Sequence, residues 1–303
     1  MQMMENFDDL FSPQPVDQPI PQGPLSDKEV WVAKKQQERE TIYHQIDEAV
    51  STMASDGPRF QTYLDVQARF DRYSVANAIL ITDQMPTATR LGDFDAWKAS
   101  GIYVKRGEIG ISILEPGKEY QREDGSVGVS YNVKKVFDIS QTNAPARPAP
   151  PQRDDRTLLK ALLNDPPCKI EVRDELPDNR NVAYVSDEGN RAILVRRGLD
   201  AHTIFRGLAQ ELARAYLEKG EKSCQSPDFA VYSAAYLLCQ RNGVPVDSFS
   251  FQRMPEVYQD MNPQELRKEL GVIREVAGEV TATMNRFFEA QQRSQKNRDS
   301  GAR

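Results

Sequence analysis

The stretch 204-IFRGLAQELARAYLEKG-220 predicts an amphipathic helix. Its apolar residues recur at steps of three and four and predict one buried stripe, made of Phe205, Leu208, Leu212 and Tyr216. Strands are expected before this helix, near 169–173, 181–186 and 192–195, after a short helix near 158–163. A helix is expected after it, near 228–242. Strands and helices in separate groups are typical of an α+β fold.

A last long helix is expected from about 263 to 293. Its apolar residues also recur at steps of three and four, and they are Leu266, Leu270, Ile273, Val276, Val280, Met284 and Phe287. This stripe must lie against its own chain or against a partner helix.

The composition restricts the classes of function. The chain of 303 residues is 39% hydrophobic and 28% charged, and no apolar run is long enough to cross a membrane. The odd set Cys168, Cys224 and Cys239 lacks C-x-x-C spacing, which disfavours disulfide frameworks and thiolate zinc sites and favours a cytoplasmic location. The net charge of −6 argues against coating of duplex DNA, although a local basic groove stays open. With only two histidines, most metal-dependent hydrolysis is disfavoured.

Residues 1–28 are rich in proline and acidic residues, which predicts a disordered tail. Within it, 6-NFDDLF-11 is either a short docking motif for a replication or conjugation partner, distantly similar to sliding-clamp peptides, or an incidental apolar cluster. The segment 143–156 is rich in proline and alanine and predicts a linker. We therefore expect two domains, at 29–142 and 157–260, followed by a C-terminal helix and tail at 261–303.

The first domain is expected to hold helices and a small antiparallel sheet. Helices are predicted from 28 to 54, from Phe60 to Pro86 and around 94–98. The isoleucines at 109–113 alternate as in a half-buried strand, and 123-EDG-125 predicts a hairpin turn. The alternation slips at Lys134 and Lys135, where we expect a bend or bulge.

The segments 73-YSVANAILITDQMPTATRLGDFDAWKASGIYVKRGEIGISILEP-116 and 136-VFDISQT-142 resemble the N-terminal domain of the ArdC antirestriction family, a module of conjugative and mobile elements whose members bind single-stranded DNA. The motifs that carry the resemblance are Tyr73-Ser74, Asn77, Gln84, Pro86, Ala88-Thr89, Trp97, Gly101, 104-VKRGE-108 and 137-FDISQT-142. The resemblance implies a single-stranded-DNA-binding protein of a mobile element.

Single-strand binding needs aromatic faces for the bases and cations along the backbone. The segment interleaves aromatic and basic residues, and the aromatics are Tyr73, Phe94, Trp97 and Tyr103. Burial in the core is the more common role for any one of them. Residues 59–142 hold eleven basic and eleven acidic residues, so only a one-sided distribution could form a binding face. The expected DNA contacts are Arg72, Tyr73, Asn77, Arg90, Trp97, Lys105, Arg106, Lys134 and Lys135.

Two groups among these positions have an alternative role. Lys105, Arg106 and Gly107 could bring backbone N–H groups close to a phosphate, or could form an ordinary β-turn with solvated charges. Asn77 and Gln84 lie seven residues apart on one helical face. They could contact base edges or cap a neighbouring loop, and capping is favoured.

The helix at 204–220 resembles the metal-binding helix of the zincin-like peptidase domain that often follows this module in the family. On that alignment, Gln210 and Arg214 replace the two histidine ligands, Tyr232 or a neighbour replaces the acidic ligand, and only Glu211, the family's general base, remains. Glutamine is a poor zinc ligand, and arginine repels a divalent cation. His202 lies about two helical turns before Gln210 and cannot substitute easily. We expect no metal and no cofactor, with Glu211 an exposed carboxylate paired to Arg214.

These inferences favour a non-enzymatic single-stranded-DNA-binding protein whose partners are DNA and a replication, conjugation or restriction protein. Two alternatives stay open. One is an unusual hydrolase that still uses Glu211. The other is an interaction factor that blocks a restriction enzyme by occupying its DNA site.

Overall fold

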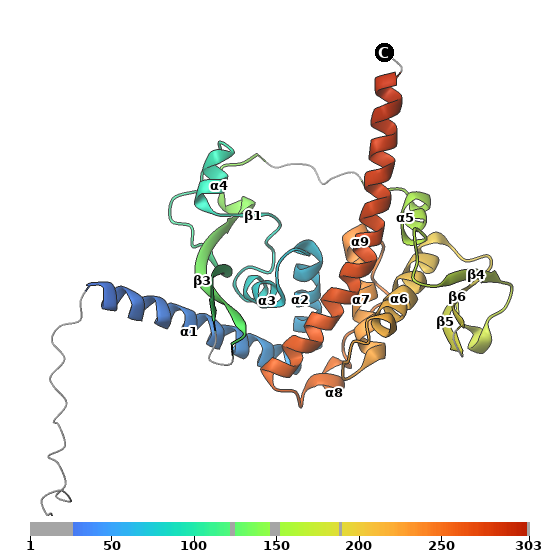
Figure 1. Ribbon diagram of the computed structural model, residues 1–303, viewed down its shortest axis with the longest axis horizontal. Helices are drawn as coiled ribbons and strands as arrows, with labels where there is room; N and C mark the ends of the chain where they lie inside the picture. The colour runs from blue at the N-terminus through green and yellow to red at the C-terminus, as the bar shows by residue number, and fades with distance from the viewer. Residues whose placement is uncertain (1–26, 122–124, 146–151, 188–189, 302–303) are drawn as a thin grey trace, which may run out of the picture.

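The computed structural model describes residues 27–121, 125–145, 152–187 and 190–301. Helices form the centre, and two small sheets lie at opposite sides of it (Figure 1). This arrangement confirms the α+β class. The docking motif at 6–11 lies outside the described residues, as do all but two residues of the expected tail. Within the described part of the chain, no helix is long and apolar enough to cross a membrane.

The first sheet has the order β1-β3-β2 and is antiparallel. Its strands are β1 (Leu91–Gly92), β2 (Ile111–Gln121) and β3 (Val127–Asp138). The predicted hairpin is confirmed. The bend expected at Lys134 and Lys135 is wrong, because β3 stays in register there and the irregularity falls in β2, between Pro116 and Glu119. Proline has no N–H for the ladder, which favours a bulge next to it.

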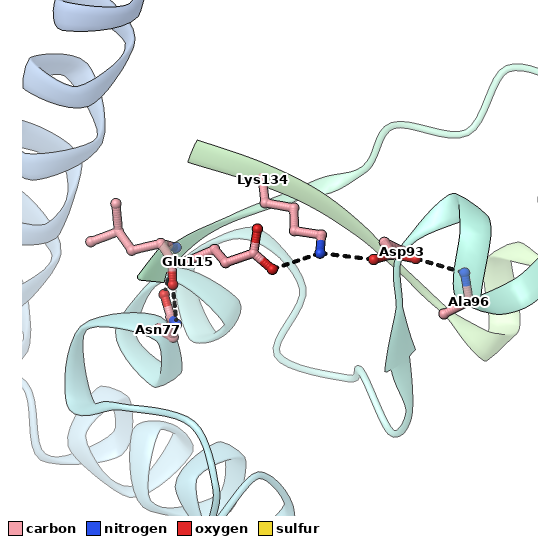
Figure 2. Close-up of polar contacts among 6 residues, drawn as sticks. Asn77, Asp93, Ala96, Glu115 and Lys134 are labelled. Carbon is pink, nitrogen blue, oxygen red and sulfur yellow. Dashed lines mark hydrogen bonds and ion pairs between the residues drawn. The ribbon is translucent and has the colours of Figure 1, made fainter. Parts of the chain in front are cut away.

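Helix α3 (Val75–Gln84) covers the outer edge of β2 with two side-chain amides. Asn77 accepts from the Leu114 N–H at 2.8 Å and donates to the Leu114 carbonyl at 2.9 Å (Figure 2). Gln84 makes the same pair with Ser112, at 2.8 and 3.0 Å. The amides thus take the place of a neighbouring strand on an edge that would otherwise be unpaired. Asn77 and Gln84 thus pair with the edge of a strand, whereas the expected capping role was at a neighbouring loop.

The helices before the sheet are α1 (Asp27–Ala54) and α2 (Gly57–Arg69). The single helix expected from Phe60 to Pro86 is wrong, because the chain breaks between α2 and α3. Ser74 is the N-cap of α3 and accepts a hydrogen bond from the Asn77 N–H. At the break, the buried Gln67 side chain donates to the carbonyls of Phe70 and Tyr73. Side-chain bonds of this kind stabilise the non-helical turn.

The second sheet follows α5 (Asp155–Leu162), and its strands confirm the predicted ones. They are β4 (Lys169–Arg173), β5 (Val182–Asp187) and β6 (Asn190–Arg196), in the order β4-β6-β5. β4 is parallel to β6 and β5 is antiparallel to it. Short 3-10 helices lie at Ile139–Gln141 and Pro177–Asn179.

The remaining helices are α6 (Ala201–Lys219), α7 (Pro227–Asn242), α8 (Met254–Tyr258) and α9 (Pro263–Gly301). Helix α8 was not predicted. The stripe of α9 is buried from Leu266 to Met284, and Phe287 is half-buried with its neighbour Phe288 buried beside it. The stripe packs on this chain itself, since α9 contacts α1, α3, α5, α6 and α7.

One hydrophobic core joins the two halves of the described chain. The ring of Phe60 in α2 lies 5.6 Å from that of Phe229 in α7 and 5.4 Å from that of Phe251. The expected domain boundaries at 29–142 and 157–260 stay a prediction. Part of the expected linker, 146–151, lies outside the described residues, and Asp155 near its end already begins α5.

Candidate nucleic-acid interface

Residues 89–109 form a lobe around the short helix α4 (Phe94–Ala99), at the end of the first sheet (Figure 1). We call it the α4 lobe. Asp93 caps the helix by accepting from the Ala96 N–H at 2.7 Å. Backbone bonds hold the lobe along residues 137–143, from Ile139 to the Arg90 carbonyl and from Lys105 to the Gln141 carbonyl. The lobe is therefore fixed by main-chain contacts, and its side chains are presented from a rigid base.

Asp138 anchors the start of the lobe. Its Oδ1 accepts from the N–H groups of Thr89 at 2.7 Å and Arg90 at 2.8 Å, and its Oδ2 accepts from Ser140 at 2.9 Å. Burial alone would raise the pKa of this carboxyl, but the backbone donors of Arg90, Ser140 and Thr89 and the Ser140 hydroxyl together outweigh burial and hold the pKa below its usual value. Asp138 is therefore a structural carboxylate.

Trp97 belongs to the core, so its expected role as a base-stacking platform is wrong in this conformation. The side chain is only 3% exposed, and its indole N–H donates to the Phe137 carbonyl at 3.0 Å. The guanidinium of Arg90 lies over the ring, 5.1 Å from its centroid. Arg90 thus reaches the surface of the lobe while it covers Trp97.

Tyr73 and Asn77 also have inward contacts. The Tyr73 ring is half-buried against the edge of Phe70, with centroids 5.6 Å apart, and burial raises the pKa of its hydroxyl. Asn77 is buried and uses its amide on β2, so the structure gives no support for a DNA contact there. Arg72, in the turn before Tyr73, is exposed.

Lys134 and Lys135, two of the expected DNA contacts, are held by oxygens of the protein. The Lys134 Nζ lies 2.8 Å from Asp93 and 2.7 Å from Glu115 (Figure 2). Hydrogen bonds to these two carboxylates raise the pKa of Lys134. Lys135 donates to the Gly110 carbonyl at 3.0 Å and to the Ser112 hydroxyl at 2.6 Å. The alternation of apolar and polar residues in the sequence slips at Lys134 and Lys135 because both side chains have polar partners.

Residues Lys105 to Glu108 form a β-turn, closed by a 3.4 Å bond from the Glu108 N–H to the Lys105 carbonyl. Gly107 has a φ of +88°, a backbone angle that residues other than glycine rarely adopt. The Lys105 ammonium donates to the Ser140 carbonyl at 2.9 Å. Arg106 is exposed, and no described residue forms an ion pair with it. The turn therefore presents one anchored cation and one solvated cation.

Two aromatic side chains of the α4 lobe are exposed. Phe94 is 54% exposed and Tyr103 is 56% exposed. The cations around them are Arg90, Lys98, Lys105 and Arg106. The lobe's carboxylates are mostly engaged, because Asp93 bonds Lys134 and Glu108 accepts from Gln141. Exposed rings and solvated cations on one rigid lobe are the elements that single-strand binding requires.

A second candidate site lies on α6. Gln210, Glu211, Arg214 and Tyr232 line one open cleft of about 650 Å³, so the structure brings the four residues of the peptidase-like pattern together. Tyr232 has a structural role there. Its hydroxyl accepts from the Ser250 N–H at 2.7 Å, and its ring lies 4.9 Å from that of Phe249.

Glu211 is buried, and the expectation of an exposed carboxylate is wrong. It is 6% exposed and accepts a hydrogen bond from the Arg214 Nε at 3.1 Å. The Arg214 Nη1 lies 2.8 Å from Asp228, a residue that sequence reasoning did not select. Although burial opposes it, the pairing with Asp228 and Glu211 raises the pKa of the guanidinium. Arg214 thus bridges two carboxylates that face the same cleft.

These residues do not fit a catalytic metal. The guanidinium already pairs with both carboxylates, and its permanent charge repels a divalent cation. Among the described residues, no group of three or more His, Cys, Asp or Glu side chains is placed to hold a metal ion. His202 does not line this cleft, and its Nε2 lies 3.3 Å from Asp155 at the start of α6.

No protein-family model matches the chain, and neither does a curated protein. The solved structures similar to it include two of the antirestriction protein ArdC from plasmid R388. The metal-free structure has a TM-score of 0.47 and 16% sequence identity over 71% of this chain and 86% of that one. The Mn(II)-bound structure has a TM-score of 0.48 and 14% identity over 70% of this chain and 85% of that one. Likenesses of this size establish neither the family nor the function of this chain.

Proposed function

We propose that the chain is a single-stranded-DNA-binding protein of a mobile element that acts in antirestriction, and that DNA lies on the α4 lobe. The observation that carries the proposal is the exposure of Phe94 and Tyr103 among four cations on a lobe fixed by backbone bonds. The sequence motifs between Tyr73 and Thr142 that resemble the ArdC family point to the same activity.

The aromatic rings and the cations of this interface contribute to the free energy of binding in different ways. A base stacked on an aromatic ring contributes about 1–3 kcal/mol, and this contribution depends little on salt. Each phosphate neutralised by a cation adds about 0.7 to the salt slope for single strands. Because the chain carries a net charge of −6, binding must depend on the local arrangement of the lobe.

The cleft on α6 has a non-catalytic role in this proposal. Glu211 would need a free carboxylate and a polarised water to act as a general base, whereas Arg214 holds it in an ion pair. The α6 and α7 helices then serve as a scaffold that packs against α2. This pairing argues against the alternative of a hydrolase that uses Glu211.

Fluorescence anisotropy with a labelled oligonucleotide tests the proposal on the full chain. The Lys105→Ala/Arg106→Ala double variant should bind more weakly at low salt and with a shallower salt slope. Tyr103→Ala should weaken binding with little change in slope. Arg253→Ala is a matched control, because Arg253 is exposed and lies before α8 in the other half of the chain. Equal affinity and slope in all folded variants would place the interface elsewhere.

A further inference from the structure

A cleft lined by two half-buried arginines, Arg241 and Arg274, lies between α2, α7 and α9, away from both sites described above. It consists of two adjoining cavities of about 490 and 460 Å³. Both are lined by Asp71, Arg241, Thr281 and Asn285. Arg274 lines the second cavity, so the two arginines border one continuous space.

Arg241 and Arg274 have only neutral hydrogen-bond acceptors within the described part of the chain. Arg241 donates to the Thr281 hydroxyl at 3.0 Å, and Arg274 donates to the backbone carbonyl of Asp71 at 3.3 Å. The Nε atom of each is buried and lacks a hydrogen-bond partner there. Neither guanidinium lies within 4.0 Å of a described carboxylate oxygen. Buried donors of this kind are normally satisfied by protein, water or a ligand.

The two guanidinium groups also repel each other. Burial lowers the pKa of Arg241, and the positive charge of Arg274 lowers it further, whereas Asp71 raises it. Two like charges beside one cavity are costly unless an anion lies between them. An anion in the cleft would relieve the repulsion between the two guanidinium groups.

Four carboxylates line the same two cavities, and most of them have partners other than Arg241 and Arg274. Asp65 already accepts from the Tyr236 hydroxyl and the Gln240 amide, each at 2.6 Å. Glu275 and Glu279 both pair with Lys222. The exposed Asp71 carboxylate remains, while Arg69 and Arg153 add two further cations to the lining of the first cavity. Three of the four lining carboxylates, Asp65, Glu275 and Glu279, therefore have partners other than the two arginines.

We propose that this cleft binds a phosphate group through Arg241 and Arg274. The guanidinium fork matches phosphate oxygens, and a phosphate has enough oxygens to accept from both arginines at once. The side-chain amide of Asn285 lines the same cavity as a neutral donor, whereas the Thr281 hydroxyl donates to the Ala277 carbonyl at 2.8 Å. The phosphate belongs either to a free phosphate compound or to the DNA backbone, and the chemistry of recognition is the same.

Thermal unfolding of the full chain in phosphate and in chloride, at matched ionic strength, tests the site. Inorganic phosphate should raise the Tm of the unaltered protein by about 5 °C at a hundredfold excess over Kd. Arg241→Gln and Arg274→Gln should each lose most of this rise. Arg286→Gln should keep the rise in Tm. Arg286 lies on α9, as Arg274 does, but it is exposed and pairs with Asp165.

The source of the phosphate follows from the same variants. If it belongs to DNA, Arg274→Gln should reduce the salt slope of oligonucleotide binding by about 0.7 for each phosphate lost. If it is a free compound, the slope should stay unchanged while the effect of phosphate on Tm is lost. No rise in phosphate beyond that in chloride, or an equal rise in folded Arg241→Gln and Arg274→Gln, would overturn the proposal.

Discussion

The Nε of Arg214 lies 3.1 Å from a carboxylate oxygen of Glu211, one turn away on the same helix. Both face the α6 cleft, and the other end of the guanidinium reaches Asp228 at 2.8 Å. The guanidinium of Arg214 therefore links the two carboxylates, Glu211 and Asp228, that face the α6 cleft.

Removal of this cation should destabilise the protein. Arg214→Met leaves the buried Glu211 carboxylate without its partner, which should cost about 1–3 kcal/mol of unfolding free energy in urea at pH 7. The Glu211→Leu/Arg214→Met double variant removes both charges and should regain most of the loss. Arg253→Met, which removes an exposed pair, is the control and should change stability by less than about 1 kcal/mol. An unchanged stability in Arg214→Met would show that the bridge is not formed in solution.

The same ion pairs predict that the stability of the protein does not depend on a bound metal. The purified protein should carry no stoichiometric zinc, and dialysis against a chelator should leave its Tm unchanged, because no folding energy comes from a metal. Elemental analysis and thermal unfolding provide the two measurements. One zinc per chain that disappears in Glu211→Gln would contradict a non-catalytic role for the cleft.

Replacement by alanine of Trp97 and of Phe94, three positions apart on α4, should have opposite effects on stability and on oligonucleotide binding. Trp97 is buried, so Trp97→Ala should cost about 3–5 kcal/mol of stability. Phe94 is exposed, so Phe94→Ala should leave stability within about 0.5 kcal/mol while it weakens oligonucleotide binding. Urea unfolding and anisotropy on both variants separate these effects. Loss of stability in Phe94→Ala would remove it from the proposed interface.

The stability of the α4 lobe should depend on pH through Asp138. Its pKa is depressed in the folded protein, so its contribution is fully present above the unfolded value of about 3.9 and is lost as the pH falls through the folded pKa. Asp138→Asn should therefore destabilise the protein at pH 7 by about 1–3 kcal/mol and by much less near pH 3. Urea unfolding at both pH values tests this, and an equal loss at both would contradict the assigned role.

Local patterns predicted most elements of the fold, because caps and apolar spacing depend on neighbouring residues. Asp93 and Asp200 begin α4 and α6 by capping them, near the predicted starts. The break at Ser74 was missed because apolar residues continue on both sides of it, and the buried Gln67 that stabilises the turn looks like a surface residue in the sequence.

The candidate sites were only partly predictable, because side-chain partners come from distant parts of the chain. Lys134 was expected to contact DNA, but Asp93 and Glu115, brought together by the sheet and α4, hold it. Asp228 was not selected, since its link to Arg214 exists only once α6 packs on α7. The arginines of the α7 and α9 cleft, 33 positions apart in the sequence, carried no motif at all.

Anisotropy of a labelled single-stranded oligonucleotide, titrated with the full chain, tests the central proposal most directly. We expect saturable binding at about 50 mM salt that weakens as salt rises, with a duplex of the same sequence competing less well. Absence of saturable binding by the folded protein at low salt, or binding that is insensitive to salt, would contradict single-stranded DNA as the ligand of the α4 lobe.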